Sequence, residues 1–591
     1  MSINSVRDDE KSVSAGKVKT LLRLFRYLLS YKKEIIAVLI IMLCTVTISL
    51  INPLIVEHAI DVNIVQKDIP GLIRLGIFAL SINLIFIVLV KLRMYIMAKV
   101  SNNVLLTIRQ ELYTHIQKLS FHFFDSRPTG KILARIIGDV NSLKDVLSNS
   151  VTTLIPDFIT ICAVMAIMFA MDYKLALASL VSLPLMVIGL WLIQVYSHVR
   201  WQVFRKKNSN LNAFIHEDLS GMRVVQSFTA EAETAADFNE LLMEHRGAFV
   251  KAVKLNDAFG PVIDFCWGLG MISLYFVGVK LTDNNSVQVG TLIAFGTYIS
   301  MFWRPIMNLS NFYNQLVTNI SGAERIFEIM DTKPEIADKK DVVELPEIKG
   351  NIRFEHVSFS YDGDTKVLDD VSFEVKAGET IALVGPTGAG KTTIINLISR
   401  FYDIQEGNIF IDDYNIKDVS IESLRKQMGI MTQDNFLFSG TIKDNIRYGK
   451  LDATDEEIIA AAKAVNAHDF IMKLEKGYDT ELKERGAGLS VGQRQLLAFA
   501  RTMVSMPKIL ILDEATSSID THTELLVQQG IEALLKGRTS FVIAHRLSTI
   551  QKADRIFVIA DNGIKEQGTA EELLAKKGMY YDLYMAQFKN I

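Results

Sequence analysis

Glycine, lysine and hydroxyl side chains follow one another between Gly385 and Thr392 in an order that can hold a phosphate group. The run fits the spacing G-x-x-x-x-G-K-[ST], in which glycines allow backbone N–H groups to close around phosphates. In such a loop Lys391 reaches the β- and γ-phosphate oxygens, and the Thr392 hydroxyl can ligate Mg²⁺. The pattern predicts an ATP-binding site made of Gly385, Pro386, Thr387, Gly388, Ala389, Gly390, Lys391, Thr392 and Thr393.

The segments around this loop have the periodicity that a phosphate-binding loop needs. The apolar run at 380–384 predicts a buried strand, and the run at 393–399 predicts a helix. The loop therefore lies at a strand-to-helix junction, where the N-terminus of the helix favours an anion. This context makes a chance glycine-rich turn a poor explanation of the motif.

Two further runs follow the loop in sequence. The first reads Leu489, Ser490, Val491, Gly492 and Gln493, and the second is an apolar strand-like run that ends in Asp513 and Glu514. A carboxylate at the end of a strand can hold the water shell of Mg²⁺, and a neighbouring carboxylate can activate an attacking water. The set indicates ATP hydrolysis.

Length and composition place part of the chain in lipid. The 591 residues exceed one ordinary domain, and 49% of them are hydrophobic, which is high for a fully soluble protein. The net charge of only −3 gives no global field that would favour nucleic acid as a partner. We expect a multi-pass protein of the cytoplasmic membrane, with the lipid bilayer as a partner.

Long apolar runs predict six membrane spans. They lie near 35–56, 73–97, 151–171, 175–197, 258–281 and 290–310. The N-terminal flank and the connections after spans 2 and 4 are basic, whereas those after spans 1, 3 and 5 are acidic or neutral. By the positive-inside rule both termini are predicted to be cytoplasmic.

The remaining segments complete a predicted domain plan. A tail at 1–17 precedes a membrane domain at 18–330, a polar linker at 331–350 and an α/β domain at 351–591 with a largely parallel sheet. Residues 18–31 form an amphipathic pattern that suits a helix along the membrane surface, although an extension of the first span is an alternative. The long charged connections near 98–150 and 198–255 predict helices that continue beyond the bilayer.

The ordered motifs resemble those of the ATP-binding-cassette exporters of type IV fold, specifically bacterial half-transporters with six spans and one cassette. The resemblance covers nearly the whole chain after the tail. It implies that Tyr361 stacks on adenine, Asp513 holds the Mg²⁺ water shell and Glu514 is the general base. It also implies that Gln433 senses Mg²⁺ and water, and that His545 contacts the γ-phosphate.

In this family the signature run at 489–493 grips the γ-phosphate bound to an opposite cassette, and Asp520 matches a loop at the contact between cassettes. The resemblance therefore implies a dimer. The usual signature has glycine where this chain has Val491, and a β-branched residue restricts the backbone. Because Glu514 and His545 are retained, we expect a heterodimer whose partner carries an intact signature but a degenerate catalytic base. Tolerance of Val491 in a homodimer is the alternative.

Two stretches, 121–131 and 218–228, resemble the short coupling helices that rest on cassettes in this family. Their aromatic and turn residues suit docking into a groove. In domain-swapped relatives the second stretch reaches the partner's cassette. The alternative for Phe121, Phe123 and Phe124 is packing within their own helical bundle.

Candidate cargo residues lie in the fifth span. Asp264 is an intramembrane carboxylate, which suggests contact with a cationic amphipath, and Trp267 is a candidate for the wall of an apolar cavity. Asp157 lies near the start of the third span, at a depth that also fits the headgroup level. Pairing of these carboxylates with a neighbouring helix is the alternative.

Three functional readings follow. The leading one is ATP-driven efflux of hydrophobic or amphipathic compounds by alternating access. A second moves lipids or lipid-linked molecules between leaflets. The third, from a different class, is an ATP-gated channel or regulatory sensor, and the retained hydrolytic residues argue against it.

Overall fold

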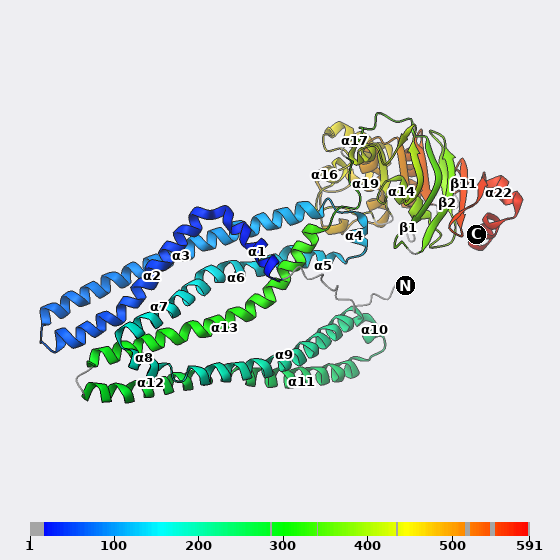
Figure 1. Cartoon of the computed structure of the whole chain (residues 1–591). Coiled ribbons are helices and arrows are strands. Elements are labelled where there is room, and N and C mark those ends of the chain that lie inside the picture. Colours follow the sequence, from blue (N-terminus) through cyan, green and yellow to red (C-terminus); the bar gives the residue numbers. More distant parts are fainter. Residues whose placement is uncertain are drawn as a thin grey trace. The chain divides into compact units, whose positions relative to one another are not determined.

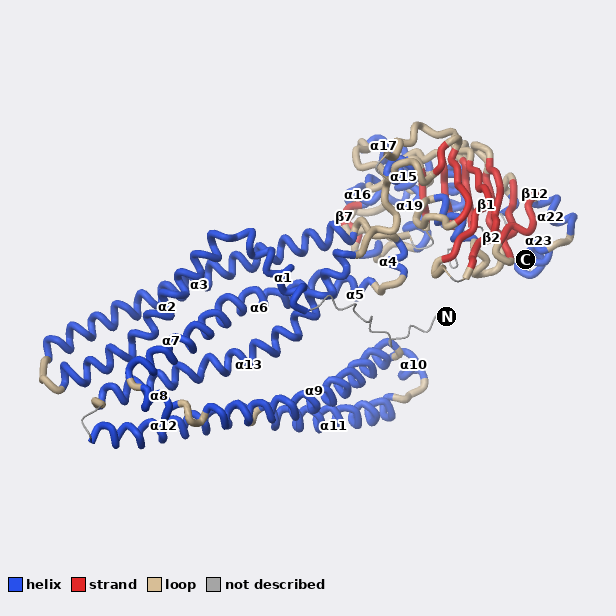
Figure 2. Tube along the Cα trace, in the orientation of Figure 1, coloured by secondary structure: helices blue, strands red, loops and turns tan. Residues whose placement is uncertain are grey.

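The chain folds into two compact units, which we call the helical unit and the α/β unit. The computed structural model describes residues 17–283, 287–339, 341–363, 365–432, 435–513, 521–543 and 550–588. The helical unit comprises the described chain up to Gln117 and Thr129–Thr332. The α/β unit comprises Lys118–Pro128, from the middle of the predicted membrane domain, and the chain from Lys333 onward. All described strands lie in the α/β unit (Figure 2).

Helices make up the helical unit, and several of them are long (Figure 1). They are α1 (Lys17–Leu28), α2 (Lys32–His58), α3 (Ile69–Ile116), α5 (Thr129–Ala134), α6 (Val140–Asn149), α7 (Ile155–Met171), α8 (Tyr173–Ser179), α9 (Leu183–Ser220), α10 (Met222–Ser227), α11 (Glu231–Asn256), α12 (Phe259–Asp283) and α13 (Val289–Asp331). π-helical turns extend α2 and join α5, α6 and α7 into one rod; they are Ala59–Ile64, Arg135–Asp139 and Ser150–Leu154.

Five helical stretches of the described chain are long and apolar enough to cross a membrane. They are Lys19–Ile64, Ile69–Ile116, Thr129–Met171, Tyr173–Ser220 and Glu231–Leu281, and they contain the first five predicted spans. The sixth predicted span, 290–310, falls in α13, whose apolar part is the shorter Val289–Trp303. Leu80 and Leu84 on α3 are 75% and 65% exposed, as expected of side chains that lipid covers.

Helix packing within the helical unit creates a bundle and a hairpin. Helix α2 packs along α3, and α13 packs against α2, α6 and α7. Helix α9 lies along α11, and the short α10 closes the end of this hairpin (Figure 1). Helix α12 joins the two parts because it packs against both α9 of the hairpin and α13 of the bundle.

The predicted surface helix is α1, which a 3₁₀ turn at Leu29–Tyr31 separates from α2. It is therefore not a simple extension of the first span. Arg23 donates to both carboxylate oxygens of Asp331, at 2.8 and 2.7 Å, and the Tyr27 hydroxyl donates to Glu111 at 2.7 Å. These contacts tie α1 to the ends of α13 and α3, while Leu22 remains 66% exposed and available to lipid.

A carboxylate from the first membrane-spanning stretch accepts hydrogen bonds from the backbone N–H groups at the start of α13. Asp61, in the π-helical turn that extends α2, accepts from the backbone N–H of Gly290 at 2.6 Å and of Thr291 at 3.1 Å. The Thr291 hydroxyl donates to Glu57 at 2.8 Å. The first N–H groups of a helix have no partner within the helix, so this side chain caps α13 from outside. A Cβ on Gly290 would lie 2.6 Å from the Asp61 carboxyl carbon, so only glycine fits this joint.

The α/β unit is built on a six-stranded sheet of order β12-β11-β3-β10-β9-β6. Its strands run parallel except β12, which pairs antiparallel with β11. This confirms the largely parallel sheet, but an antiparallel sheet, β2-β1-β4-β5, was not predicted. The strands are β1 (Ile352–Ser360), β2 (Lys366–Val375), β3 (Thr380–Val384), β4 (Glu406–Ile411), β5 (Tyr414–Asn415), β6 (Met428–Met431), β7 (Gly440–Thr441), β8 (Glu481–Leu482), β9 (Ile509–Asp513), β10 (Thr539–Ile543), β11 (Arg555–Ala560) and β12 (Gly563–Gly568).

Both faces of the parallel sheet are buried, because successive side chains of a strand point to opposite faces. Ile381 and Leu383 of β3 enter a core shared with α14 and the antiparallel sheet, whereas Ala382 and Val384 enter a core shared with α19. The helices of the unit are α4 (Phe121–Asp125), α14 (Lys391–Ile398), α15 (Ile421–Lys426), α16 (Ile442–Arg447), α17 (Asp455–Ala464), α18 (His468–Met472), α19 (Val491–Val504), α20 (Thr521–Leu535), α22 (Ala570–Lys576) and α23 (Met579–Phe588).

Candidate functional site

The predicted phosphate loop connects the end of β3 to the start of α14. Its three glycines have positive φ, with 149° at Gly385, 85° at Gly388 and 103° at Gly390. A Cβ on Gly385 would lie 2.2 Å from the carbonyl oxygen of Ile559, so any other residue there would displace the loop or β11. The backbone of this loop thus depends on glycine for conformation and, at Gly385, for space.

Lys391, the first residue of α14, folds back over the loop. Its Nζ donates to the carbonyl oxygens of Gly385 and Pro386, both at 2.8 Å. Burial lowers the pKa of the Lys391 ammonium, and the Asp513 carboxylate opposes that shift. Phosphate oxygens in the loop would therefore offer this partly desolvated ammonium a charged partner in place of two carbonyls.

Strand order brings the other chemical positions to the same edge of the sheet. Asp513 ends β9 and pairs in register with Ile543, the last residue of β10, which itself neighbours β3. The carboxyl ends of parallel strands meet at one edge, so Asp513 and the phosphate loop lie on the same side. Thr392 is exposed in the first turn of α14, whereas Thr393 is buried.

Four predicted residues lie outside the described residues: Gln433, Glu514, Asp520 and His545. Glu514 directly follows a strand of the parallel sheet, and Gln433 and His545 each come one residue later than that. Thr432 follows β6, Asp513 ends β9, and Ile543 ends β10, and these strands are neighbours. Their roles stay predictions.

Tyr361, the predicted adenine-stacking residue, directly follows β1 and is 38% exposed. Its hydroxyl lies 3.2 Å from Thr393 Oγ1, which links it to α14. Its ring makes edge contacts with Phe359, at 4.8 Å between centroids, and with Tyr402, at 4.9 Å. These contacts fix the ring while leaving part of its surface open to a stacking partner.

The signature residues form the start of α19. Ser490 is the N-cap: its Oγ accepts from the Gln493 backbone N–H at 3.2 Å, and its own N–H donates to Gln493 Oε1 at 2.9 Å. Within the described part of the chain the Ser490 hydroxyl donates to no acceptor, so its proton is available to an anion, which a helix N-terminus favours. The carbonyl of Leu489 accepts from Arg494 at 2.7 Å.

Val491 is the first residue of α19 and is 42% exposed, whereas Gly492 is buried. Its backbone is not among the positive-φ positions of the described chain. The expected backbone restriction by a β-branched residue is thus not visible, because a helical first turn accepts valine. What Val491 changes is the surface beside the Ser490 hydroxyl.

In the helical unit, Asp264 and Trp267 lie on α12. Asp264 is on an exposed strip with Ile272 and Phe276, which are 68% and 63% exposed. Trp267 donates from Nε1 to the Ser300 hydroxyl on α13 at 3.3 Å. Asp157 instead accepts from the Asn308 side-chain amide at 3.0 Å, so the pairing alternative holds for Asp157.

The two predicted coupling stretches contain α4 and α10. Phe123 on α4 is only 3% exposed, and the Phe121 ring lies 4.2 Å from the Phe401 ring, between centroids. On this first stretch the aromatic side chains therefore pack within the α/β unit. On the second, Val224 is 61% exposed and Phe228, which follows α10, is 81% exposed.

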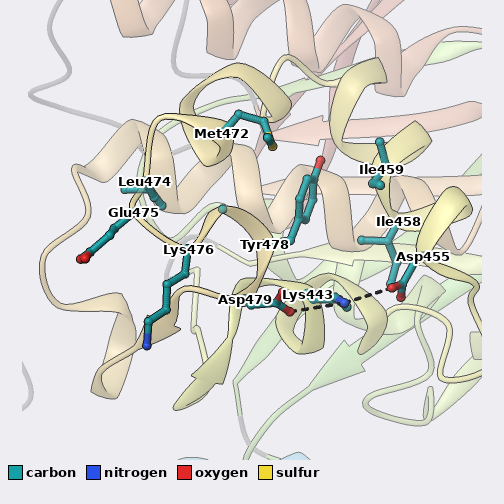
Figure 3. Close-up of a pocket in the computed structure, with 11 residues that line it drawn as sticks. Lys443, Asp455, Ile458, Ile459, Met472, Leu474, Glu475, Lys476, Tyr478 and Asp479 are labelled. Carbon is teal, nitrogen blue, oxygen red and sulfur yellow. Dashed lines mark hydrogen bonds and ion pairs between the residues drawn. The ribbon is translucent and has the colours of Figure 1, made fainter.

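A cavity of about 530 Å³ lies elsewhere in the α/β unit, among α16, α17 and α18 (Figure 3). In it Lys443 pairs with Asp455 at 3.0 Å and with Asp479 at 3.3 Å, beside the Tyr478 ring. None of the predicted site residues lines it. The cavity and the predicted nucleotide site are separate, and no motif in the sequence marked the cavity.

Known proteins resemble the chain over most of its length. Residues 35–306 match the family described as ABC transporter transmembrane region, and residues 368–517 match the family described as ABC transporter. An ATP-dependent lipid A-core flippase of Syntrophus aciditrophicus is 41% identical over 84% of the chain and 82% of the relative. A Staphylococcus aureus protein named "Putative multidrug export ATP-binding/permease protein" is 38% identical over 96% of the chain and 99% of the relative.

The fold agrees with these relatives. A solved structure of a bacterial Atm1-family ABC exporter with ATP bound superposes with a TM-score of 0.79 at 30% identity. The match covers 94% of this chain and 98% of that chain. Both the helical unit and the α/β unit therefore have counterparts in one known exporter.

Proposed function

The chain belongs to the ABC transporters, and from this premise we propose that it is one half of a dimeric exporter that drives hydrophobic or amphipathic compounds out of the cytoplasm. Family membership gives a multi-pass membrane protein that couples ATP hydrolysis to export. The finer statements concern the site residues, the cargo and the partner. Each is argued from the described geometry below.

ATP and Mg²⁺ are the proposed cofactors, and the described residues fit them. The glycine loop presents backbone N–H groups, Lys391 faces the loop, and the Tyr361 ring is partly open for adenine. Thr392 and Asp513 supply a hydroxyl and a carboxylate for Mg²⁺, which prefers oxygen ligands. When bound, Mg²⁺ neutralises charge that develops on the phosphates. Gln433 is the third proposed ligand.

Hydrolysis itself is assigned to residues next to this site. Glu514 is the proposed general base that takes the proton of the attacking water. His545 is proposed to contact the γ-phosphate, and Gln433 to orient water near the metal. The support is their position along the chain, within two residues of the ends of the neighbouring strands β6, β9 and β10.

A dimer follows from the signature, and the observation that carries this is that the Ser490 hydroxyl donates to no acceptor among the described residues. Ser490 already accepts one hydrogen bond as N-cap of α19, and it can donate another to the γ-phosphate of an ATP held by an opposing cassette. Asp520 is proposed to contact that cassette. The exposed Val224 and Phe228 around α10 fit the same arrangement, because docking on the opposing cassette would bury them.

Val491 supports a heterodimer in which the partner subunit carries the intact signature. Its side chain adds bulk beside the Ser490 hydroxyl, at the place where a phosphate held by the other cassette must approach closely. The helical backbone at Val491 is the observation that favours the second candidate, a homodimer that tolerates valine. Purification of the tagged chain from its host separates them: an equimolar second half-transporter supports the heterodimer, and an active dimer of this chain alone contradicts it.

The proposed cargo is a cationic amphipath, and Asp264 is its proposed contact. A carboxylate on an exposed strip of a spanning helix is costly in lipid, so this strip is expected to face a cavity or a second subunit. Trp267 lies at its edge, fixed by Ser300. The flippase relative supports a second candidate, a lipid-linked molecule moved between leaflets.

Transport assays in proteoliposomes test the proposal. We expect cargo to stimulate ATP hydrolysis and a cationic dye to accumulate against its gradient when ATP is present. Flux that runs only down the gradient would indicate an ATP-gated channel instead. Dye flux that is absent, together with ATP-dependent movement of a labelled lipid, would favour the flippase.

A further inference from the structure

Tyr402 connects the predicted adenine-binding end of the nucleotide site to α4. Its ring meets the Tyr361 ring at 90°, with the centroids 4.9 Å apart, and it also contacts Phe359 at 5.8 Å. Its hydroxyl donates a short hydrogen bond to the carboxylate of Asp125, the last residue of α4. One side chain, 8% exposed, therefore touches both the base-binding residue and α4.

The neighbouring residue reinforces this contact. The Phe401 ring packs against the ring of Phe121 on α4. The Arg425 guanidinium lies over the same Phe401 ring, 4.8 Å from its centroid. Arg425 also donates to the Arg400 carbonyl at 2.8 Å, which fixes the backbone just before Phe401. Two consecutive residues, Phe401 and Tyr402, thus hold the first and last residues of α4.

The electrostatics keep the Tyr402 hydroxyl a donor. Burial and the Asp125 carboxylate both raise the pKa of Tyr402, so the hydroxyl is protonated at physiological pH. Breaking the hydrogen bond of this largely buried hydroxyl would cost free energy, because the donor would be left without a partner. Movement of the Tyr402 ring and movement of Asp125 are therefore linked.

We propose that Tyr402 is a positioning residue that transmits occupation of the base site at Tyr361 to α4. The inference rests on the proposed function, in which adenine stacks on Tyr361. Stacking fixes the Tyr361 ring, the edge contact fixes Tyr402, and the hydroxyl fixes Asp125. This route responds to the base, independently of the γ-phosphate and of the hydrolytic residues.

Hydrogen exchange of the Lys118–Pro128 amides in the full chain tests this route without measuring transport. In wild type, ATP should slow exchange in this segment, whereas tripolyphosphate, which lacks a base, should slow it only in the phosphate loop. In Tyr402→Phe the ring contact remains, and ATP should protect the phosphate loop but not Lys118–Pro128. Equal protection of this segment by ATP and tripolyphosphate would overturn the proposal.

Transport coupling gives a second readout. Tyr402→Phe should bind ATP within about twofold of wild type, yet cargo stimulation of hydrolysis should fall about five- to tenfold, a usual range for coupled sites. Asp125→Ala should do the same, and the double variant should be no worse than either single one. Asp125→Asn, whose amide oxygen still accepts, should restore most of the stimulation.

The control variant is Tyr414→Phe, which removes a hydroxyl from an exposed tyrosine on β5 and should leave both readouts unchanged. Additive losses in the double variant, or full stimulation in Tyr402→Phe, would refute the relay. If wild type shows no ATP-dependent protection even in the phosphate loop, the proposed nucleotide site is wrong, and that failure is distinct from a failure of the relay.

Discussion

The α/β unit and the helical unit place their large apolar side chains in opposite ways. In the α/β unit Leu383, Phe541 and Phe557 are fully buried, and the chemical residues lie at the strand ends. In the helical unit Leu80 and Ile87 on α3 are 75% and 62% exposed. A phosphate site demands particular residues at particular backbone angles, whereas lipid demands only apolar surface. The sequence of the α/β unit therefore contains motifs that predict its ligand, whereas the apolar pattern of the helical unit predicts membrane spans but not the transported compound.

The largest expected effect is at the proposed general base. Glu514→Gln should lower ATP hydrolysis by about 10²–10⁴-fold, because glutamine cannot take a proton from water. ATP binding, followed with a fluorescent analogue, should persist. Full hydrolytic activity in this variant would remove Glu514 from the mechanism and weaken the contrast between the units.

Glycine substitutions test the contrast directly. Gly385→Ala should weaken ATP binding by about 10- to 100-fold, because backbone strain and overpacking each cost about 1–3 kcal/mol. The added Cβ would lie 2.2 Å from a carbonyl oxygen of β11. Gly388 also has a positive φ, but a Cβ there would have no neighbour within 4 Å. Gly388→Ala should therefore weaken ATP binding less than Gly385→Ala does.

The matched control lies in the helical unit. Gly76 on α3 has open space around a Cβ, and Gly76→Ala should leave ATP binding and thermal stability unchanged or slightly improved. ATP binding by Gly385→Ala equal to that of Gly76→Ala would show that the phosphate loop is not built as described.

The lesson for sequence-based prediction follows from such residues. The phosphate loop and the strand that ends in Asp513 were predictable because each has its own glycine or apolar run, whereas the run at Ser490 was interpreted from the family resemblance. The role of Tyr402 was not, since its partner Asp125 is 277 positions away and no motif joins them. The antiparallel sheet was missed because bulges interrupt β1 and β2 and blur their alternation.

A smaller effect is expected in the helical unit. Asp264→Asn should reduce transport of a cationic dye about tenfold, equivalent to about 1.4 kcal/mol, because the carboxylate charge is lost. Transport of a neutral compound of similar size should be unchanged. Equal losses for both compounds would mean that Asp264 supports the fold of α12 and does not select cargo.

The smallest expected effect concerns the signature. Val491→Gly should raise ATP turnover about two- to threefold, because it removes the side chain that stands beside the Ser490 hydroxyl. This change corresponds to a decrease of less than about 1 kcal/mol in the activation free energy. Steady-state ATPase of the purified dimer measures this. A decrease would indicate that valine at the start of α19 contributes more through helix stability than it hinders at the phosphate.

The cap of α13 by Asp61 implies a latch, by which we mean a contact that must break before the adjoining ends of α2 and α13 can separate. By the predicted orientation, this contact lies on the outer side of the membrane, where α2 and α13 meet. If those ends separate during export, the Asp61 carboxylate must release two backbone N–H groups, at about 1.5–3 kcal/mol for each hydrogen bond to a charged group. The latch would then make the outward-open state the less populated one at rest, and ATP-driven closure of the cassettes would supply the work that opens it.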